Sequence, residues 1–283
     1  MIIHAYKYQG AGNDFVIIDN RNDEYSNLTS KEINLLCDRR FGIGGDGLML
    51  LGKSNKYDFS MRYFNSDGPE GTMCGNGGRC LVAFASKMGI NKFEFEAIDG
   101  YHRAEIVSHD SKTIIVRLKM IDVMGFDKFI NSDNTNSEHH DAYFLNTGSP
   151  HYVEFVNDVK NYPVDEKGKY WRYYKDFKGG TNVNFVEILD NSTLFVRTYE
   201  RGVEAETFAC GTGITASALS AYTKLRKNKL TLQEEYYLYN IKALGGDLKV
   251  DFIYNKIENQ FKEVYLTGPA TFVFDTYIEI GEE

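Results

Sequence analysis

The sequence predicts an α+β protein with mostly antiparallel strands, arranged as two similar domains. Segments in which apolar and polar residues alternate, rich in β-branched and aromatic side chains, outnumber segments with helical periodicity. One block of sequence occurs twice, at residues 61–86 and 196–220, which indicates an internal repeat. The length of 283 residues is near twice that of a usual domain and leaves room for two.

Strand patterns and helix patterns can be placed in chain order. The predicted strands are 15–19, 59–64, 93–98, 113–118, 184–189, 193–199 and 249–254. The predicted helices are 29–38, 79–89, 165–176 and 214–227, of which 165–176 is expected on the surface. Thr29 and Glu32 have the spacing of a capping signal at the start of the first helix. The polar segment 131–141 is expected to form a loop.

Composition and charge exclude several classes of protein. Hydrophobic residues make up 42% and charged residues 25%, which is typical of a globular chain with a sizeable core. The 32 basic residues are outnumbered by 40 acidic ones, and the net charge of −8 argues against binding to nucleic acid or a membrane surface. No apolar run approaches the roughly 18 residues of a membrane span, and the start of the chain does not resemble a secretory signal. We therefore expect a cytoplasmic protein that binds a small polar substrate or another protein.

The two copies of the repeat share one layout. Each begins with a strand that carries an arginine, Arg62 or Arg197, continues through a glycine-containing turn, and reaches Cys-Gly-x-Gly before a helix of small residues. The interval from arginine to cysteine is 12 residues in the first copy and 13 in the second. Two similar domains that face one another around a pseudo-twofold axis would follow from this repetition.

Cys74 and Cys210 each stand directly before one of these helices. The first-turn amides and the helix dipole favour negative charge there, so the pKa of both thiols is expected to fall. The same amides, at Gly75–Asn76 and Gly211–Thr212, could hold a carboxylate. With a thiol on either side of it, a proton could leave the carbon next to that carboxylate and return on the opposite face, without a metal or an organic cofactor.

The other cysteines and a glycine-rich segment are expected to be structural. Cys37 and Cys80 lie inside helical patterns and are expected in the core. There is no CxxC pair, and no metal site is expected. Segment 41–47, FGIGGDG, satisfies GxGxxG, but it follows a helix and precedes a strand, the reverse of a dinucleotide-binding motif. We expect a tight turn there and no bound nucleotide.

Six segments resemble diaminopimelate epimerase and occur in the order of that family along nearly the whole chain. They are QGAGNDFVIIDNR (9–21), RRFGIGGDG (39–47), FNSDGPEGTMCGNGGR (64–79), TGSPHYV (147–153), GTNVNFVE (180–187) and YERGVEAETFACGTG (199–213). The resemblance implies an isomerase without cofactors that interconverts LL- and meso-2,6-diaminopimelate in lysine and peptidoglycan synthesis. It also implies that each domain is a curled sheet around a central helix, with the active site between the domains.

The resemblance implies roles for individual residues. Cys74 and Cys210 match the catalytic pair, one acting as thiolate base and the other as thiol acid. The residues that match substrate-binding positions are Asn13, Asn65, Gly75, Asn76, Asn182, Glu200, Arg201, Gly211 and Thr212. His151, together with Glu200, matches polar residues that bind substrate or adjust the pKa of the thiols. Ser149 stands where many members carry asparagine and Gly47 where some carry glutamine, so these two positions depart from the family pattern.

The expected organisation follows from the repeat and the resemblance together. The first domain is expected at residues 1–119, with residues 265–283 returning to it, and the second at residues 120–264. The expected partner is a small-molecule substrate, with no nucleic acid and no membrane. A homodimer is compatible with the sequence, which does not determine the oligomeric state.

Other functions stay open at this point. A proline racemase or hydroxyproline epimerase of the same superfamily would share the paired cysteines, although CGNG and the Glu200–Arg201 pair favour an acyclic substrate with two charged ends. A Cys–His hydrolase with His151 as its base would not explain why the cysteine element occurs twice. A redox or non-catalytic thiol protein would not explain the asparagines and the arginine that accompany the cysteines.

Overall fold

The computed structural model describes residues 1–110, 112–125, 141–225 and 234–281. The chain divides into two compact units, one of Met1–Lys119 with Thr267–Glu283 and one of Met120–Leu266. The predicted polar loop at 131–141 lies, apart from Asp141, outside the described residues. Among the helices that the structure describes, none is both long enough and apolar enough to cross a membrane.

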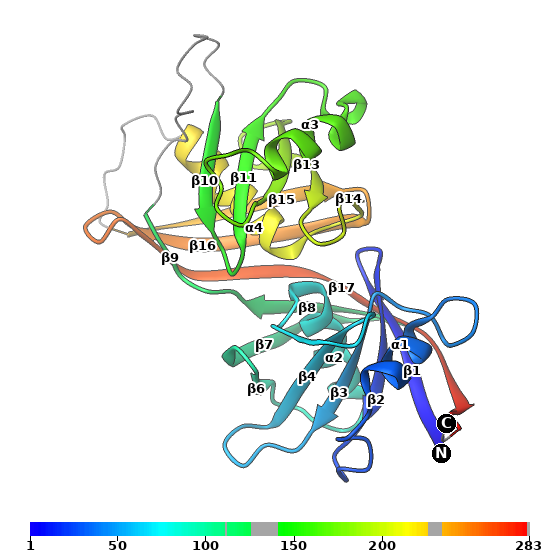
Figure 1. The fold of residues 1–283 in the computed structure, drawn as a ribbon. Coiled ribbons are helices and arrows are strands. Elements are labelled where there is room, and N and C mark those ends of the chain that lie inside the picture. Colours follow the sequence, from blue (N-terminus) through cyan, green and yellow to red (C-terminus); the bar gives the residue numbers. More distant parts are fainter. Residues whose placement is uncertain (111, 126–140, 226–233, 282–283) are drawn as a thin grey trace. The chain divides into compact units, whose positions relative to one another are not determined.

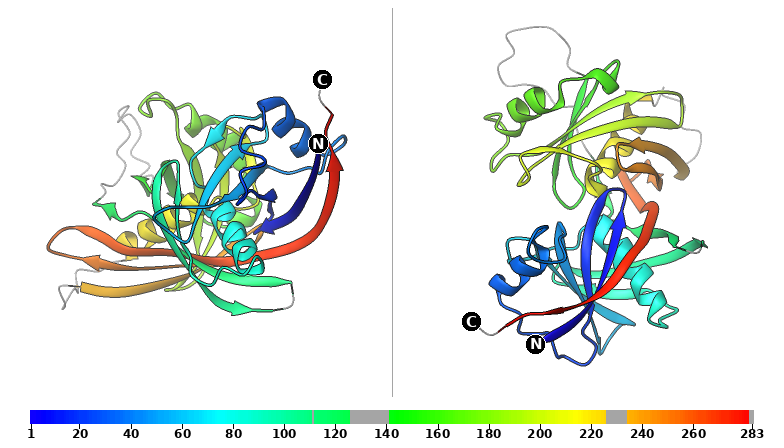
Figure 2. Two further views of the ribbon diagram at one scale, coloured as in Figure 1. Left: turned by 90° about the horizontal axis from the view of Figure 1, so that it is seen from below. Right: turned by 90° about the vertical axis from the view of Figure 1, so that its right-hand side faces the viewer.

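In the first unit a closed sheet surrounds one helix (Figure 1). Its elements are β1 (Ile2–Gly10), β2 (Asn13–Asp19), α1 (Ser30–Cys37), β3 (Gly47–Gly52), β4 (Phe59–Asn65), β5 (Glu70–Gly71), α2 (Gly75–Lys87), β6 (Glu94–Ala97), β7 (Gly100–His109), β8 (Thr113–Lys119) and the last part of β17 (Gln260–Glu279). Hydrogen bonds run from β1 through β2, β3, β4, β6, β7 and β8 to β17, and β17 pairs with β1 to close the ring (Figure 2). Closure leaves no open sheet edge in this ring, and α2 is buried along most of its length.

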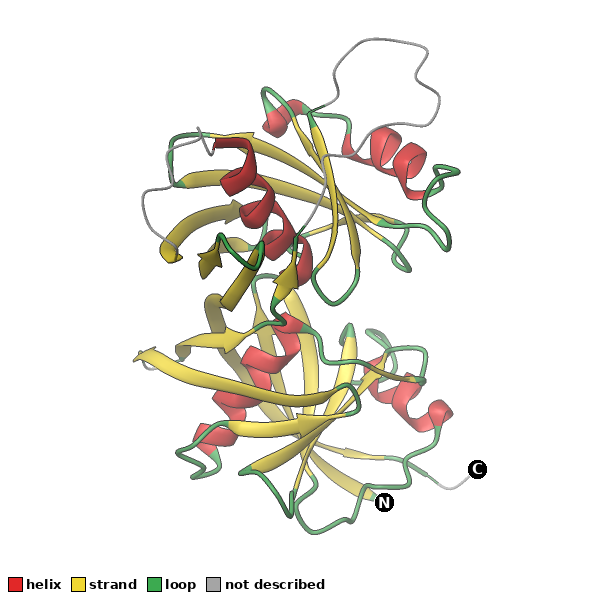
Figure 3. Ribbon diagram, turned by 90° about the vertical axis from the view of Figure 1, so that its left-hand side faces the viewer, coloured by secondary structure: helices red, strands yellow, loops and turns green. Residues whose placement is uncertain are grey.

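The second unit repeats this plan. Its elements are β9 (Val123–Met124), β10 (Ala142–Asn146), β11 (Pro150–Phe155), the 3-10 helix η1 (Val159–Asn161), α3 (Val164–Arg172), β12 (Asn182–Ile188), β13 (Thr193–Glu200), β14 (Ala205–Thr207), α4 (Gly211–Leu225), β15 (Glu234–Ala243), β16 (Gly246–Asn255) and the first part of β17. The helix α4 is buried along most of its length and packs against β10 to β13, β15 and β16. Figure 3 shows one long helix among the strands of each unit.

The strand pairings of the two units follow the same order, which confirms the predicted repeat. From β1 to β7 the successive pairings are antiparallel, parallel, antiparallel, antiparallel, parallel and antiparallel. From β10 to β16 the series is identical. The α+β class with mostly antiparallel strands and two similar halves is therefore confirmed.

The helices differ from the prediction mainly at their first residues. Thr29 caps α1, and the capping box with Glu32 is present, as predicted. The helices predicted from residues 79 and 214 begin earlier, at Gly75 and Gly211, because the glycine-rich segments after each cysteine are themselves helical. Glycine is a poor helix former, so the sequence pattern placed these glycines in a turn, whereas tertiary packing makes them the first helical turn.

The helix α3 is shorter than predicted and is not confined to the surface. It covers residues 164–172, and Trp171 on its inner face is 5% exposed. The Trp171 ring stacks on Tyr152 of β11 with a centroid distance of 4.5 Å. This ring pair belongs to the core of the second unit.

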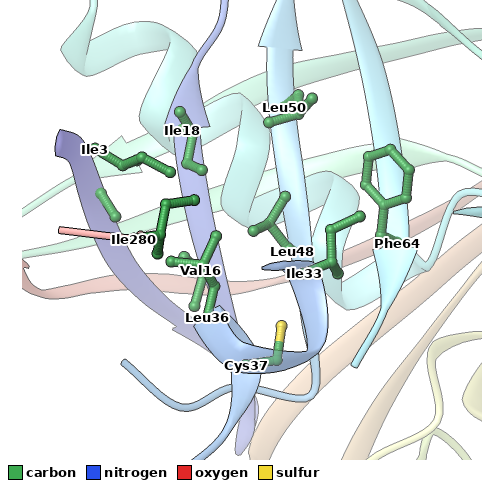
Figure 4. Close-up of a cluster of buried hydrophobic side chains, with 11 residues drawn as sticks. Ile3, Val16, Ile18, Ile33, Leu36, Cys37, Leu48, Leu50, Phe64 and Ile280 are labelled. Carbon is green, nitrogen blue, oxygen red and sulfur yellow. The ribbon is translucent and has the colours of Figure 1, made fainter. Parts of the chain in front are cut away.

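A separate apolar cluster fixes α1 against the outside of the first sheet (Figure 4). Ile33, Leu36 and Cys37 of α1 pack with Val16 of β2 and Leu48 of β3. The segment that follows α1 carries Arg39 and Asp46, which take part in the site described below. The cluster therefore determines where those two charges lie.

The capping box of α1 gives a first prediction. Replacing the cap, Thr29→Ala, is expected to cost about 1 kcal/mol of helix stability, since it removes a hydrogen bond to the first turn. Amide hydrogen exchange in α1 should then be about fivefold faster. Glu32→Ala should have a smaller effect, and the double variant should lose less than the sum, because the two side chains act as one unit. Unchanged exchange in Thr29→Ala would show that the box does not stabilise α1.

Candidate active site

Cys74 lies at the N-cap position of α2 and is half-buried. Its Sγ is 3.8 Å from Oδ1 of Asn13, at the start of β2. Asn76, in the first turn of α2, has its Nδ2 3.5 Å from the same oxygen. The backbone N–H groups of the first turn, which begins at Gly75, point out of the N-terminal end of the helix. The thiol, these amides and Asn13 thus meet where the helix dipole favours negative charge.

A charged network orients Asn13. Its Nδ2 donates to the carboxylate of Asp46, which also accepts from the backbone N–H of Asp14 at 3.1 Å. Arg39 bridges the two carboxylates, with nitrogen–oxygen distances of 2.7 and 2.8 Å to Asp14 and 2.8 Å to Asp46. Burial alone would raise the pKa of Asp14, but hydrogen bonds from Arg39 and Lys7 hold it well below its usual range. Because the amide nitrogen of Asn13 faces Asp46, its oxygen is left facing the thiol.

Arg79 is a guanidinium buried inside the first unit. It is 0% exposed, and it donates to the carbonyl oxygen of Gly75 at 3.2 Å and to Oδ1 of Asn76 at 2.9 Å. Its Nε has no hydrogen-bond partner within the described part of the chain. Burial lowers the pKa of Arg79, against the opposing effect of the nearby thiols of Cys80 and Cys74. The cation fixes the side chain of Asn76 in the first turn of α2.

Cys210 has the same place in the second unit, directly before α4. It is 7% exposed, and its carbonyl oxygen accepts the N–H of Ile214 at 2.8 Å. Its Sγ lies 3.5 Å from Oγ1 of Thr212 in the first helical turn. Each of the two cysteines therefore stands at the N-terminus of the central helix of its own unit.

His151 on β11 is the centre of a polar network below the start of α4. Its Nε2 lies 2.9 Å from Oγ of Ser149 and 2.9 Å from Oγ1 of Thr212. Its Nδ1 lies 3.0 Å from Nδ2 of Asn184 on β12. Complete burial, followed by the positive charge of Arg201, lowers the pKa of His151 from 6.5 to about 3. The imidazole is therefore neutral at physiological pH.

Asn182 and Arg201 are joined through the backbone. Oδ1 of Asn182 accepts the backbone N–H of Arg201 at 2.8 Å, and its Nδ2 donates to Ser149 at 3.2 Å. The side chain of Arg201 is exposed. Glu200, at the end of β13, accepts a hydrogen bond from the hydroxyl of Thr207 at 3.0 Å. In the second unit the structure thus links Asn182, Ser149, His151, Thr212 and Cys210, which the sequence had singled out, and the backbone of Arg201.

The remaining expected residues of the first unit lie beside each other on neighbouring strands. Asn65 ends β4 with an exposed side chain, and it pairs with Gly47 at the start of β3. A Cβ at position 47 would come within 2.6 Å of both the carbonyl oxygen of Phe64 and the ring of Tyr63. Tyr63 therefore occupies the space into which a side chain at position 47 would project, which explains the glycine there.

The two other cysteines are buried thiols. Burial raises the pKa of Cys37 and that of Cys80 to about 12, so both are protonated at neutral pH. All four cysteines are present as thiols. Among the residues that the structure describes, no three His, Cys, Asp or Glu side chains are grouped as a metal ion would require.

The residues of the site that escaped the sequence analysis include Asp46, Arg79 and Asn184. Asn184 could have been found, because it is two residues after Asn182 on one strand and therefore points to the same face. Asp46 lies in the glycine-rich turn, where its contact with Asn13 depends on strand pairing. Arg79 follows the motif inside a helix, and its burial has no signal in the sequence.

The neutral state of His151 predicts a pH dependence of stability. The unfolded chain binds a proton near pH 6.5, whereas the folded chain binds it only near pH 3, so unfolding takes up a proton between these values. The free energy of unfolding should therefore fall by up to about 1.4 kcal/mol for each pH unit as the pH drops from about 6.5. Urea denaturation followed by the fluorescence of Trp171, the single tryptophan, would measure this in the second unit. His151→Gln should have a shallower slope, and equal slopes would contradict the assignment.

Comparison with known proteins gives a consistent result for the sequence. The profile of the family described as Diaminopimelate epimerase matches residues 5–121 and 143–273. The diaminopimelate epimerase of Flavobacterium psychrophilum is 46% identical over 280 residues, which cover 96% of this chain and 99% of that protein. The diaminopimelate epimerase of Chlorobaculum tepidum is 42% identical over 271 residues, covering 94% of this chain and 97% of that protein.

Solved structures of more distant proteins share the fold. A phenazine biosynthesis protein of the PhzF family from Bacillus anthracis has a TM-score of 0.71 at 15% identity, covering 99% of this chain and 100% of that one. A hydroxyproline epimerase from Agrobacterium vitis has a TM-score of 0.66 at 13% identity, covering 98% of this chain and 92% of that one. At these identities the likeness shows a common fold, while the profile and the two close relatives extend over nearly the whole sequence. The chain belongs to the diaminopimelate epimerase family.

Proposed function

We propose that this protein interconverts LL- and meso-2,6-diaminopimelate, using Cys74 and Cys210 as its acid and base. The observation that carries the proposal is that each unit has a thiol at the N-terminus of its central helix. The names of the relatives and the matching family profile support the same substrate. The family resemblance implies that the reaction belongs to the synthesis of lysine and peptidoglycan precursors.

The reaction needs one proton removed and one delivered. A thiolate takes the α-proton, and the electron pair left on carbon is delocalised into the adjacent carboxylate, which becomes enolate-like. First-turn amides at Gly75–Asn76 and Gly211–Thr212 stabilise that charge, because they are fixed dipoles that need no reorientation. The second cysteine, as a thiol, gives its proton to the opposite face of the carbon and becomes the thiolate. Each turnover therefore exchanges the roles of Cys74 and Cys210.

The far end of the substrate needs its own partners. Diaminopimelate carries a second carboxylate and a second ammonium group, which suit a guanidinium, a carboxylate and amide side chains. We assign Arg201 and Glu200 to this role, with Asn65 and Asn182. The exposed side chain of Arg201 and the exposed end of β4 at Asn65 support it.

The alternatives fit less well. A hydrolase would need His151 to contact Cys210 as a base, but its ring nitrogens contact Asn184, Ser149 and Thr212, and its pKa is lowered to about 3. A proline racemase or hydroxyproline epimerase shares the fold with this chain at low identity. Comparing proline with diaminopimelate as substrates would separate that alternative directly.

We also infer a cytoplasmic location. The proposed reaction needs two free thiols, and the cytoplasm keeps thiols reduced. The oligomeric state, for which the sequence allows a homodimer, would be measured by sedimentation of the purified protein.

The decisive experiment uses deuterated water. Metal-free protein incubated with LL-diaminopimelate in D2O should yield meso product with one deuterium at the inverted α-carbon, because the delivered proton comes from a thiol that exchanges with solvent. Meso product without deuterium, or no product, would overturn the proposal.

The two thiols should be equally necessary. Cys74→Ala and Cys210→Ala are each expected to lose nearly all epimerisation, because either change leaves a single acid–base group. Cys37→Ala and Cys80→Ala are the matched controls, and both should retain most of the activity per folded molecule because those thiols are buried and protonated. Near-normal turnover in either of the first two variants would rule out the two-base reaction.

Specificity should come from the end of the substrate that does not react. Lysine lacks the second carboxylate, so its kcat/KM is expected to be lower than that of diaminopimelate by about 10³-fold or more. Arg201→Ala should reduce kcat/KM for diaminopimelate much more than for lysine, so the ratio of kcat/KM between the two substrates should become smaller. Similar kcat/KM for both substrates in the unaltered protein would indicate a broad racemase instead.

A further inference from the structure

Backbone groups determine which polar side chains below the start of α4 donate hydrogen bonds and which accept them. A backbone carbonyl oxygen can only accept a hydrogen bond, and a backbone N–H can only donate one. Where such a group contacts an asparagine amide, it decides which end of the amide is oxygen and which is nitrogen. Asn182 and Asn184 on β12 are both determined in this way.

Asn184 determines the tautomer of His151. Its Nδ2 lies 3.1 Å from the carbonyl oxygen of Tyr152, and its Oδ1 accepts the hydroxyl of Thr198 at 3.0 Å. The same Nδ2 lies 3.0 Å from Nδ1 of His151, so this ring nitrogen faces a donor and must be the acceptor. The neutral ring then carries its proton on Nε2. That N–H is shared between the hydroxyls of Ser149 and Thr212, each 2.9 Å away.

Asn182 supplies a second donor to Ser149. Its Oδ1 accepts the backbone N–H of Arg201 at 2.8 Å, and its Nδ2 donates to the carbonyl oxygen of Pro150 at 3.1 Å. The amide is thus fixed from both ends. Its Nδ2 also donates to Oγ of Ser149 at 3.2 Å.

The hydroxyl protons follow from counting donors and acceptors. Ser149 Oγ receives hydrogen bonds from Asn182 and His151, so its own proton points to its remaining neighbour in the described chain, Oγ1 of Thr212, at 3.2 Å. Thr212 Oγ1 accepts from Ser149 and His151, which leaves its proton for Sγ of Cys210 at 3.5 Å. The hydrogen bonds therefore donate in one direction, from the asparagines of β12 toward the sulfur of Cys210.

We propose that Asn184 and Ser149 are positioning residues that make the Thr212 hydroxyl a hydrogen-bond donor to the sulfur of Cys210. A hydroxyl that donates to sulfur stabilises the thiolate over the thiol. In this series of hydrogen bonds His151 is a neutral donor through Nε2. The positive charge of Arg201 also disfavours the imidazolium. The role of these hydrogen bonds in catalysis rests on the proposed epimerase activity. The direction in which each of them donates does not depend on that activity.

The direction can be measured on the free protein by nitrogen-15 NMR of labelled histidine. The ring of His151 should not titrate down to about pH 5, and its signals should be absent in His151→Gln. The nitrogen that carries the proton is recognised by its chemical shift and its one-bond coupling. We expect the proton on Nε2, and a proton on Nδ1 would overturn the proposal.

Variants test what the direction does to the sulfur. Asn184→Leu should let a proton reach Nδ1 of His151, whereas Ser149→Ala should leave the tautomer unchanged, because Nε2–H still has Thr212 as acceptor. At pH 7, alkylation of Cys210 by iodoacetamide should be about tenfold slower in Asn184→Leu and in Thr212→Val, which is the effect expected for the loss of one charge-assisted hydrogen bond. Thr212→Ser keeps the hydroxyl and should react at the rate of the unaltered protein. Peptide mapping reports Cys74 in the same sample as the internal control.

The outcomes separate this inference from the proposed function. An unchanged tautomer in Asn184→Leu, or an equal change at Cys74 and Cys210, would overturn the positioning role. In the epimerase assay Asn184→Leu should lower kcat with little change in KM, since the residue acts through the thiolate and not on bound substrate. If the tautomer and alkylation results hold but no deuterium enters diaminopimelate, the proposed function fails and the chain of hydrogen bonds stands.

Discussion

A helix that begins inside a curled sheet has first-turn N–H groups that its own turns cannot pair, and both units are built around this constraint. The buried polar residues of the protein include Asn76, Arg79, His151, Asn182 and Asn184, all of which lie in or below the first turns of α2 and α4. Polar groups in such a place are costly unless they are hydrogen-bonded, so they form networks. The first-turn amides also favour negative charge at the helix start, and a cysteine precedes them in each unit.

The two units meet this constraint with different side chains. In the first unit the partners are charged: Asp46 and Arg39 orient Asn13, and Arg79 holds Asn76. In the second unit they are neutral amides, an imidazole and hydroxyls. The symmetry of the strand pairings therefore does not extend to the surroundings of the sulfurs. In the proposed reaction the substrate is asymmetric about its reacting carbon, because one arm bears the distal groups, so two thiols with different surroundings would suit it.

The sequence predicts the parts of this design that are local. The repeat, the cysteine before each helix and the capping box at Thr29 all depend on residues close together in the chain, and the structure confirms them. Asp46 and Arg79 were missed because their contacts come from strand pairing and from the closure of a barrel, for which single-sequence patterns carry no signal. The early starts of α2 and α4 were missed because glycine argues against a helix unless packing demands it. The family resemblance implies a set of substrate-binding residues, whereas the direction of the hydrogen bonds depends on contacts between strands that are far apart in the sequence.

The second glycine of each Cys-Gly-x-Gly shows how one motif can answer two different demands. A Cβ at Gly77 would lie 3.2 Å from Sδ of Met49, the end of a flexible side chain that can move. A Cβ at Gly213 would lie 2.2 Å from Oδ1 of Asn184 and 3.2 Å from Cε1 of His151, both held by hydrogen bonds. At α2 the glycine therefore serves apolar packing, but at α4 it brings the helix start into direct contact with the polar chain. The start of α4 and the side chain of Asn184 therefore constrain each other's position. The surroundings of the Cys210 sulfur, which directly precedes the helix, depend on both.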